Sequence, residues 1–392
     1  MAQLAAQQDD SKRFRDVFGR LLQQVVQMDA SEMFLTADFP PTVRLDGKLT
    51  KLMDDPMAAE HCRKIARAIC DDRRWQSFLT LNSASFVLSD EGARFRVNLF
   101  THQRKVGLVA QRLPSSVQDI ASLGLPQWLR DSAMRDAGLI LVATAAGQGR
   151  TSVVQSMLHH RNVHAQGHIL SVENMIEVPH KHINCMVTQR EITTDTPHMR
   201  VALQDAFHQS VDAIFLGDIA DYESLSMILR HADARLVVAS IMADGVMEAV
   251  ERLLSLATVD SRADLGVSLA MSLSEVYSHQ LVPRQDENGV MVATERLLMS
   301  ARSSGHLANG RMRELSSMLG DGRGVEVHSA NHSLFSLYEQ YQINLGEAVY
   351  RSNDRVGLRS RLRIESVRYD SEGGDLGGDG DLDIPQSDVL RA

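Results

Sequence analysis

Residues 137–151 read AGLILVATAAGQGRT and have the outline of a phosphate-binding loop between a buried strand and a helix. The usual pattern, GxxxxGK[ST], uses glycine to bring backbone N–H groups close to phosphate and lysine to reach the β- and γ-phosphates. Aligned with this pattern, Thr144 occupies the first glycine slot, and Gly147 and Gly149 supply flexible backbone. Arg150 stands in the lysine slot. The sequence therefore predicts a nucleotide-binding loop whose defining cation is changed.

Arg150 keeps the charge of the missing lysine but not its shape. Its planar guanidinium is bulkier, and it cannot lie along the phosphates as a compact ammonium does. Either Arg150 binds phosphate in an unusual pose, or it is a surface or salt-bridged arginine beside a vacant loop, and the second interpretation is favoured. Thr151 and Ser152 follow it, and we expect both to contact nucleotide, with the Thr151 hydroxyl as the Mg²⁺ ligand. ATP and Mg²⁺ are the expected cofactors, unless their binding has been lost.

Two acidic residues end predicted strands that would face the same loop. Asp218 ends the run DAIFLGD, where a carboxylate would lie beside Mg²⁺ and the γ-phosphate, and Glu173 ends the run HILSVE. Aspartate is about one methylene shorter than glutamate, so it can miss the hydrogen-bond distance that a general base needs. Taken singly, an acid at a strand end can equally be a solvated loop residue. Because the loop and both acids occur in the order of a nucleotide site, Glu173 and Asp218 are the candidate catalytic residues.

These residues require a parallel sheet to bring them together. Short apolar runs of the buried type recur in GLILVAT, HILSVEN, DAIFLGD and ARLVVASI, and longer polar or amphipathic stretches separate them. This alternation predicts an α/β domain with a parallel-rich sheet over residues 127–366, with its nucleotide site at the carboxyl ends of the strands.

A smaller domain is predicted before it, since a chain of 392 residues exceeds the size at which one core stops growing. Residues 1–112 contain a helix-like segment, FRDVFGRLLQQVVQM, followed by the strand-like segments PPTVRLDGKL and RFRVNLFTHQRKVGLVAQRL. The connection LPSSVQDIASLGLP, residues 113–126, contains two prolines and several serines and is predicted to be a linker.

Composition narrows the function classes. No apolar run approaches the roughly 20 residues that span a bilayer, and the N-terminus lacks a signal-peptide core, so a cytoplasmic protein is expected. The net charge is −9, and residues 371–392 hold six acids and one arginine, so a disordered acidic tail is predicted over 367–392. The remaining body is only mildly acidic, which argues against non-specific nucleic-acid binding.

Cysteine and histidine give weak signals. The three cysteines form neither a CxxC site nor an even disulfide framework, and buried thiols are the simplest interpretation of Cys62, Cys70 and Cys185. A metal site at His180 and His182 rests on two residues in a loop without a nearby cysteine or carboxylate cluster, so solvated histidines are favoured.

Several separated segments resemble the type IV pilus retraction ATPases, PilT and especially PilU, of the secretion-ATPase superfamily. The segment ASEMFLTADFPPTVRLDGKL is similar to the family signature ASDLFLTxGxPPxxRxxG. The segment HILSVENMIEVPHKHINCMVTQREITTDT is similar to the stretch that spans the family's Asp box, IEDPIEF, and its VTQREVG sequence. The resemblance continues to SNDRVGLRSRLRI near Ile364. It implies a PAS-like N-terminal domain and a RecA-like ATPase domain assembled in a hexameric ring, with Arg94, Arg96 and Arg112 reaching a nucleotide at a subunit boundary.

Departures from the family concentrate in the predicted pocket. Asn174 and Met175 stand where the Asp box has Asp and Pro, and the family's GE[VM]R becomes Gly217, Asp218, Ile219 and Ala220. Met242 stands where the family has the histidine of its His box. The family's helical AIRNLIR motif is hardly visible in SARSSGHLANG, where Ser304, Gly305 and Gly310 predict a weakened helix. Four changes around one pocket indicate relaxed or abandoned hydrolysis.

The resemblance and these departures together predict a PilU-like accessory subunit of the pilus retraction machinery with weakened or lost ATP hydrolysis. An active retraction ATPase that uses Arg150 and Asp218 with Mg²⁺ is the alternative, and a nucleic-acid translocase is disfavoured by the charge. The expected partners are a homo-oligomer or a mixed ring with an active retraction ATPase, and the inner-membrane platform protein of the pilus. The expected location is the inner face of the cell membrane, without insertion into it.

Overall fold

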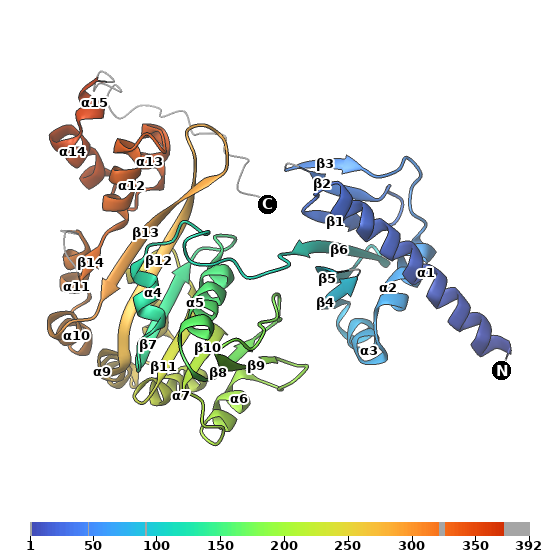
Figure 1. The fold of residues 1–392 in the computed structure, drawn as a ribbon, viewed down its shortest axis with the longest axis horizontal. Helices are drawn as coiled ribbons and strands as arrows, with labels where there is room; N and C mark the ends of the chain where they lie inside the picture. Colours follow the sequence, from blue (N-terminus) through green and yellow to red (C-terminus); the bar gives the residue numbers. More distant parts are fainter. Residues whose placement is uncertain (1, 46, 91, 321–325, 372–392) are drawn as a thin grey trace. The chain divides into compact units, whose positions relative to one another are not determined.

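The computed structural model describes residues 2–45, 47–90, 92–320 and 326–371. They fall into two units (Figure 1). Unit 1 contains the described residues of Met1–Ser116 together with Met175–Pro179, and unit 2 contains those of Val117–Asn174 and His180–Leu390. Within the described ranges, none of the helices combines the length and apolar character that crossing a bilayer requires.

Unit 1 is an α+β domain built on a six-stranded antiparallel sheet with the order β3-β2-β1-β6-β5-β4. Its elements are α1 (Ala2–Gln27), β1 (Glu32–Leu35), β2 (Thr42–Leu45), β3 (Lys48–Lys51), α2 (Ala59–Ile69), α3 (Asp72–Leu81), β4 (Ser83–Asp90), β5 (Ala93–His102) and β6 (Lys105–Leu113). Phe14, Phe18 and Leu22 recur at helical spacing along α1 and are buried in the core of this unit. The predicted helix and strands are all present, although α1 begins earlier than the apolar pattern indicates.

Unit 2 is an α/β domain around an eight-stranded sheet with the order β14-β13-β12-β7-β11-β10-β8-β9. Its strands are β7 (Gly138–Thr144), β8 (Gly167–Glu173), β9 (Cys185–Glu191), β10 (Ala213–Asp218), β11 (Leu236–Met242), β12 (Leu273–Pro283), β13 (Val290–Leu298) and β14 (Val327–His328). Pairing is parallel from β12 to β9 and antiparallel from β12 to β14. The parallel-rich sheet predicted from the sequence is confirmed.

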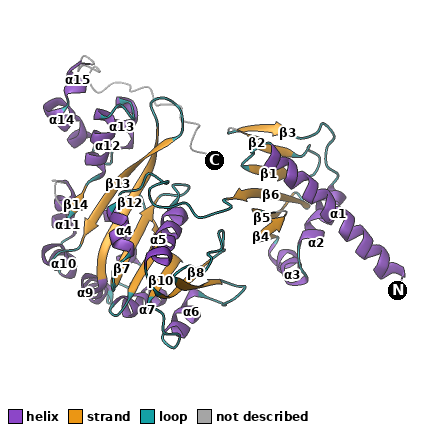
Figure 2. Cartoon of the chain, in the orientation of Figure 1, coloured by secondary structure: helices purple, strands orange, loops and turns teal. Residues whose placement is uncertain are grey.

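In the sequence of unit 2, the helix α4 precedes these strands, and the other helices lie between and after them (Figure 2). They are α4 (Trp128–Ala133), α5 (Arg150–His164), α6 (Met199–Ala206), α7 (Tyr222–Ala232), α8 (Val246–Ser255), α9 (Arg262–Ser272), α10 (Ala301–Ala308), α11 (Met312–Gly320), α12 (Ala330–Glu339), α13 (Leu345–Arg351), α14 (Arg355–Glu365) and α15 (Val367–Ser371).

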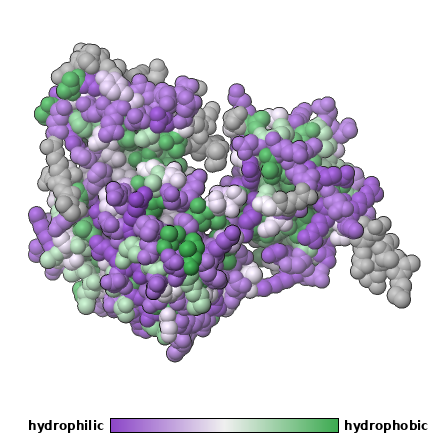
Figure 3. Space-filling view, viewed as in Figure 1, coloured by the Kyte–Doolittle hydropathy of each residue, from purple (hydrophilic) through white to green (hydrophobic). Residues whose placement is uncertain are grey.

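The strand that leads into the glycine loop, β7, is buried along its whole length. Its side chains alternate between two cores: Leu139 and Leu141 pack in the core that includes α6 to α9, whereas Ile140 and Val142 pack in the core that includes α4 and α5. Coverage on both faces explains why the strand reads as a continuous apolar run. The outer surface of each unit mixes hydrophilic atoms with smaller hydrophobic patches in the view of Figure 3.

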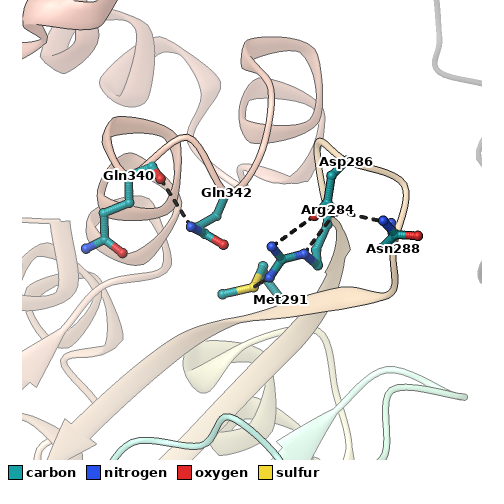
Figure 4. A network of polar contacts seen from close by, with 6 residues as sticks. All are labelled: Arg284, Asp286, Asn288, Met291, Gln340 and Gln342. Atoms are coloured by element: carbon teal, nitrogen blue, oxygen red, sulfur yellow. Dashed lines mark hydrogen bonds and ion pairs between the residues drawn. The ribbon is translucent and has the colours of Figure 1, made fainter.

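The hairpin of β12 and β13 is not apparent from the sequence. Its strands pair from Glu275 opposite Leu298 to Pro283 opposite Val290. In the turn between them, Arg284 pairs with Asp286 at 3.0 Å and donates to the Met291 sulfur at 3.2 Å. Figure 4 shows this turn beside Gln340 and Gln342, which belong to the segment that follows α12.

The segment SARSSGHLANG, where a weakened helix is expected, forms α10. Ser300 and Ser303 make a reciprocal capping box at its start, and Leu307 is buried on its inner face. Gly310 has φ of 66°, and the N–H groups of Gly310 and Arg311 donate to the carbonyl oxygens of Leu307 and His306. This glycine therefore ends the helix instead of disrupting it.

The first residues of the predicted acidic tail are helical and not disordered. They form α15, where Arg368 is buried and donates to the carbonyl oxygen of Ile343 at 3.2 Å. Its guanidinium also lies 4.3 Å from the ring centre of Tyr341. These contacts anchor the segment, which composition alone does not reveal. The rest of the predicted tail, 372–392, lies outside the described residues.

Candidate functional site

The predicted loop connects β7 to α5 at the carboxyl edge of the sheet in unit 2. Gly147 and Gly149 have φ of 77° and 80°, a left-handed conformation that glycine adopts without strain. A Cβ built on Gly147 would meet nothing within 4 Å, so space is open beside the loop. Among the described residues, no side chain caps the first turn of α5, and its N–H groups are oriented as in an anion site. The backbone of the loop fits a phosphate group.

Arg150 and Asp218 are bonded to each other at this edge. Nη2 of Arg150, the first residue of α5, donates to Oδ2 of Asp218 at 2.7 Å, and the other carboxylate oxygen accepts from Ser240 Oγ at 3.1 Å. The two side chains are 19% and 38% exposed. The second amino group of Arg150, Nη1, is buried and has no hydrogen-bond partner among the described residues. The cation of the lysine slot and a candidate catalytic carboxylate thus neutralise one another.

Glu173, the other candidate acid, is buried at the end of β8 and accepts three hydrogen bonds. Gln155 donates to Oε2 at 2.7 Å, while Ser171 and Gln189 donate to Oε1 at 2.7 and 3.0 Å. Burial raises the pKa of Glu173, and these three donors oppose that rise. Both carboxylate oxygens are engaged within the protein, so Glu173 is held as part of the fold.

The two loop histidines take different partners. His180 bonds through Nε2 to Gln155 Oε1, and its backbone N–H donates to Gln189 Oε1 at 2.6 Å, so it belongs to the network around Glu173. Burial lowers the pKa of His180 to about 4. His182 accepts the backbone N–H of Val187 through Nδ1 at 3.0 Å. The described residues contain no group of three or more His, Cys, Asp or Glu arranged to hold a metal ion.

The remaining predicted residues of the loop differ in exposure. Thr144 is fully buried, and its hydroxyl donates to the Ala145 carbonyl oxygen at 3.2 Å. Thr151 and Ser152 are exposed in the first turn of α5, where their hydroxyls can meet a ligand. Met242, which stands at the end of β11, is 46% exposed. Thr151 would supply a Mg²⁺ ligand, but the acids expected near it are already engaged by protein donors.

Arg96 and Arg112 belong to unit 1, whereas the loop and both acids belong to unit 2. Arg96 lies on β5 and forms an ion pair with Glu177, a residue of the same unit. Arg112 lies on β6 and pairs with Asp29 at 2.6 Å. Both arginines therefore have carboxylate partners within unit 1, and their contact with nucleotide stays a prediction.

Sequence reasoning missed three polar residues that organise the site. Ser240 lies within a buried strand and bonds Asp218, Gln155 lies on the inner side of α5 and bonds Glu173, and His279 on β12 contacts the loop. A polar residue inside an apolar run is the signal that could have identified Ser240, because a buried hydroxyl needs a partner.

The family model for Type II/IV secretion system proteins matches residues 7–367. The type IV pilus ATPase PilU of Pseudomonas aeruginosa is 27% identical over 351 residues, which cover 89% of this chain and 92% of the relative. The type IV pilus retraction ATPase PilT of the same organism is 28% identical over 266 residues, covering 67% of this chain and 77% of the relative.

Solved structures of ATPases are also similar to this chain. A crystal structure of the pilus retraction motor PilT with bound ADP superimposes with a TM-score of 0.78 at 26% identity, covering 86% of this chain and 97% of the other. The ATPase DotB of Legionella pneumophila superimposes with a TM-score of 0.73 at 18% identity, covering 84% and 93% of the two chains, and shows the fold alone. These findings confirm the predicted family and the predicted fold, a small N-terminal domain followed by a RecA-like ATPase domain.

Proposed function

We propose, on the premise that the chain belongs to the Type II/IV secretion system protein family, that it is a PilU-like accessory subunit of the type IV pilus retraction machinery with weakened or lost ATP hydrolysis. The relatives named PilU and PilT support a role in pilus retraction. A relative in Neisseria gonorrhoeae that is named a twitching motility protein supports a role in that motility. The chemistry of the loop supports the reduced hydrolysis.

The ion pair of Arg150 and Asp218 is the observation that carries the proposal. Hydrolysis needs a cation on the transferred phosphate and a carboxylate that orients the attacking water. Here the two charges that would do this are 2.7 Å apart and bonded to each other. Removing one contact to a developing transition state commonly lowers the rate on the order of 100-fold to 1,000-fold. The loss of the family's histidine at Met242 acts in the same direction.

Nucleotide binding is a separate question, because the loop backbone remains suited to phosphate. The pilus retraction motor PilT whose structure resembles this chain was solved with bound ADP. The glycine loop, the start of α5 and the hydroxyls of Thr151 and Ser152 would hold the phosphates of ATP or ADP, and Thr151 would hold Mg²⁺. Arg150 would join them only by leaving Asp218. Partly exposed ion pairs contribute about 0–1 kcal/mol, so phosphate can compete for this arginine.

The alternative is an active retraction ATPase. One observation favours it: Asp218, although shorter than glutamate, does reach the loop and is oriented there by Ser240. In that case nucleotide would draw Arg150 onto phosphate and release Asp218 to act on water. Turnover measurements separate this activity from the accessory role.

An accessory subunit acts by assembly, so we propose a homo-oligomer or a mixed ring with an active retraction ATPase. The pilus platform protein of the inner membrane and the inner face of that membrane are the corresponding partner and location. Light scattering at micromolar concentration should give an oligomer, or native purification should recover a motor partner. A monomer with no motor partner would argue against this part of the proposal.

Isothermal titration calorimetry with ADP and ATP tests the competition for Arg150. We expect weak binding by the native chain and tighter binding by Asp218→Asn, since the neutral amide oxygen holds the guanidinium less strongly than the carboxylate does. Arg230→Gln, which removes an exposed charge on α7, is the control and should bind as the native chain does. Equal affinity of Asp218→Asn and the native chain would show that the ion pair does not restrain the loop.

A further inference from the structure

Gln148, the residue between the two loop glycines, is attached to β12 by two hydrogen bonds. Its backbone carbonyl oxygen accepts from Nε2 of His279 at 2.6 Å, and its side-chain Oε1 accepts the backbone N–H of Leu281, also at 2.6 Å. A Cβ built on Gly149 would lie 4.0 Å from His279 Nε2, so the imidazole lies against the loop. One residue thus uses its backbone and its side chain to tie the loop to a neighbouring strand.

The protonation state of His279 follows from this geometry. A carbonyl oxygen only accepts, so Nε2 carries the proton and Nδ1 is the unprotonated nitrogen. Nδ1 is buried and has no partner among the described residues, and His279 as a whole is 6% exposed. Burial also lowers the pKa of His279 to about 4, so the imidazole is neutral at physiological pH. Its single hydrogen bond is therefore directed at the loop.

The strand that holds the loop is itself attached to the C-terminal helices of unit 2. Nε2 of Gln280 donates to the carbonyl oxygen of Arg351 in α13 at 3.0 Å. In the turn after β12, the backbone N–H of Gln285 donates to the Gln342 carbonyl oxygen at 2.8 Å. Arg368 of α15 donates to Gln285 Oε1 at 3.0 Å. Figure 4 shows this turn next to the segment of Gln340 and Gln342.

We propose that His279 is a positioning residue that fixes the backbone of the glycine loop through Gln148, and that β12 extends this restraint to the C-terminal helices. Glycine on both sides of Gln148 leaves the loop many conformations to lose when it binds a phosphate. The two bonds to β12 remove that freedom before any ligand arrives, which is how preorganisation improves binding. The expected gain in nucleotide affinity rests on the proposed function, whereas the restraint on the loop does not.

Hydrogen–deuterium exchange of the full chain without nucleotide tests the restraint directly. Two amides report the restraint on the loop, because the N–H of Leu281 donates to Gln148 Oε1 and the N–H of Val153 donates to the Gly149 carbonyl oxygen. In His279→Leu, both should exchange about fivefold to tenfold faster, the effect of losing one hydrogen bond. His279→Gln can still donate from its amide and should restore slow exchange. A purely structural role would not be rescued in this way by a side chain of different shape.

His231 provides the matched control. It is fully buried on α7, its Nε2 bonds the Leu203 carbonyl oxygen at 2.8 Å, and its Nδ1 has no partner among the described residues. His231→Leu should lower the stability of unit 2 but leave exchange in the loop unchanged. If His231→Leu and His279→Leu accelerate loop exchange equally, or if neither does, the positioning role is overturned.

The link to the C-terminal helices has its own test. Gln280→Leu removes the bond to α13 and should accelerate loop exchange about twofold to fivefold. Combined with Gln148→Ala, which removes the side-chain acceptor, it should add little, because both changes act on one connection. Fully additive effects would contradict the coupling. A chain that binds no ADP in calorimetry but shows the expected exchange would refute nucleotide binding and leave the positioning role standing.

Discussion

Unit 2 contains two arginine–carboxylate ion pairs that differ in burial and in the number of hydrogen bonds that support them. Arg296 of β13 pairs with Glu275 of β12 through two bonds of 2.9 and 3.3 Å, and Ser132 donates to the same carboxylate at 2.7 Å. Trp128 lies under the guanidinium at 4.2 Å, and Glu275 is fully buried. The pair of Arg150 and Asp218 has a single bond, more exposure and an unpartnered buried Nη1. The first pair is buried and held by several contacts, so it stabilises the fold. The second has fewer contacts and an unpartnered donor, so a ligand can separate its two side chains.

The largest expected effect is on the stability of unit 2, and it differs between the two pairs when the arginine of each is removed. Arg296→Ala leaves Glu275 as an uncompensated buried charge and should destabilise unit 2 by about 3–5 kcal/mol. Arg150→Ala removes a partly exposed pair and should cost about 1 kcal/mol or less. In a Trp75→Phe background Trp128 is the only tryptophan, so urea unfolding followed by its fluorescence reports unit 2. Equal losses would end the distinction between the two pairs.

A second expected effect concerns restoration of the loop. Arg150→Lys combined with Asp218→Glu and Met242→His should increase turnover or nucleotide affinity about tenfold or more, if only the side chains were lost. The double variant that keeps Arg150 is the control and should gain less. No gain from the triple change would mean that the backbone of residues 144–149 has also left its phosphate-binding conformation.

A third effect is pH-dependent and arises from His279, whose pKa burial lowers from 6.5 to about 4. Between these values the unfolded chain binds a proton that the folded chain does not, so stability falls as the pH falls from 6.5 towards 4. His279→Gln removes this proton and should flatten that part of the curve, by roughly 3 kcal/mol at most. Urea unfolding at several pH values between 7 and 4 measures the difference. An unchanged slope would show that His279 is protonated in the fold.

The smallest effects come from the serines that support each pair. Ser132→Ala leaves the fully buried Glu275 with one donor fewer and should cost about 1–3 kcal/mol. Ser240→Ala removes a bond of 3.1 Å to the more exposed Asp218 and should cost about 1 kcal/mol or less. Thermal unfolding of both variants measures how much stability each carboxylate loses with its serine donor. A larger loss for Ser240→Ala would reverse the assignment of the structural pair.

Much of the fold was predictable because the buried strands are apolar along their length. β7, β8, β10 and β11 agree within about two residues with the predicted runs. β12 was missed because it carries polar residues, such as Glu275 and His279, whose partners lie far away in the sequence. No local pattern can indicate that a buried polar residue has a distant partner.

The site was predictable in its members but not in their bonding. Sequence motifs identified Arg150, Asp218 and Glu173 by type and spacing. Arg150 and Asp218 are 68 residues apart, and only the order of the strands brings α5 and the end of β10 together. The hydrogen bonds that engage Glu173 come from residues on α5, β8 and β9. The engagement of these charges by one another and by amides is therefore a property of the folded chain.

Steady-state ATP turnover of the purified full chain, measured beside PilT of Pseudomonas aeruginosa under the same conditions, tests the central claim most directly. Because Arg150 and Asp218 are bonded to each other, we expect turnover about 100-fold to 1,000-fold slower than that of PilT. Turnover comparable to PilT that disappears in Arg150→Ala would contradict the account and establish the chain as an active ATPase with a variant loop.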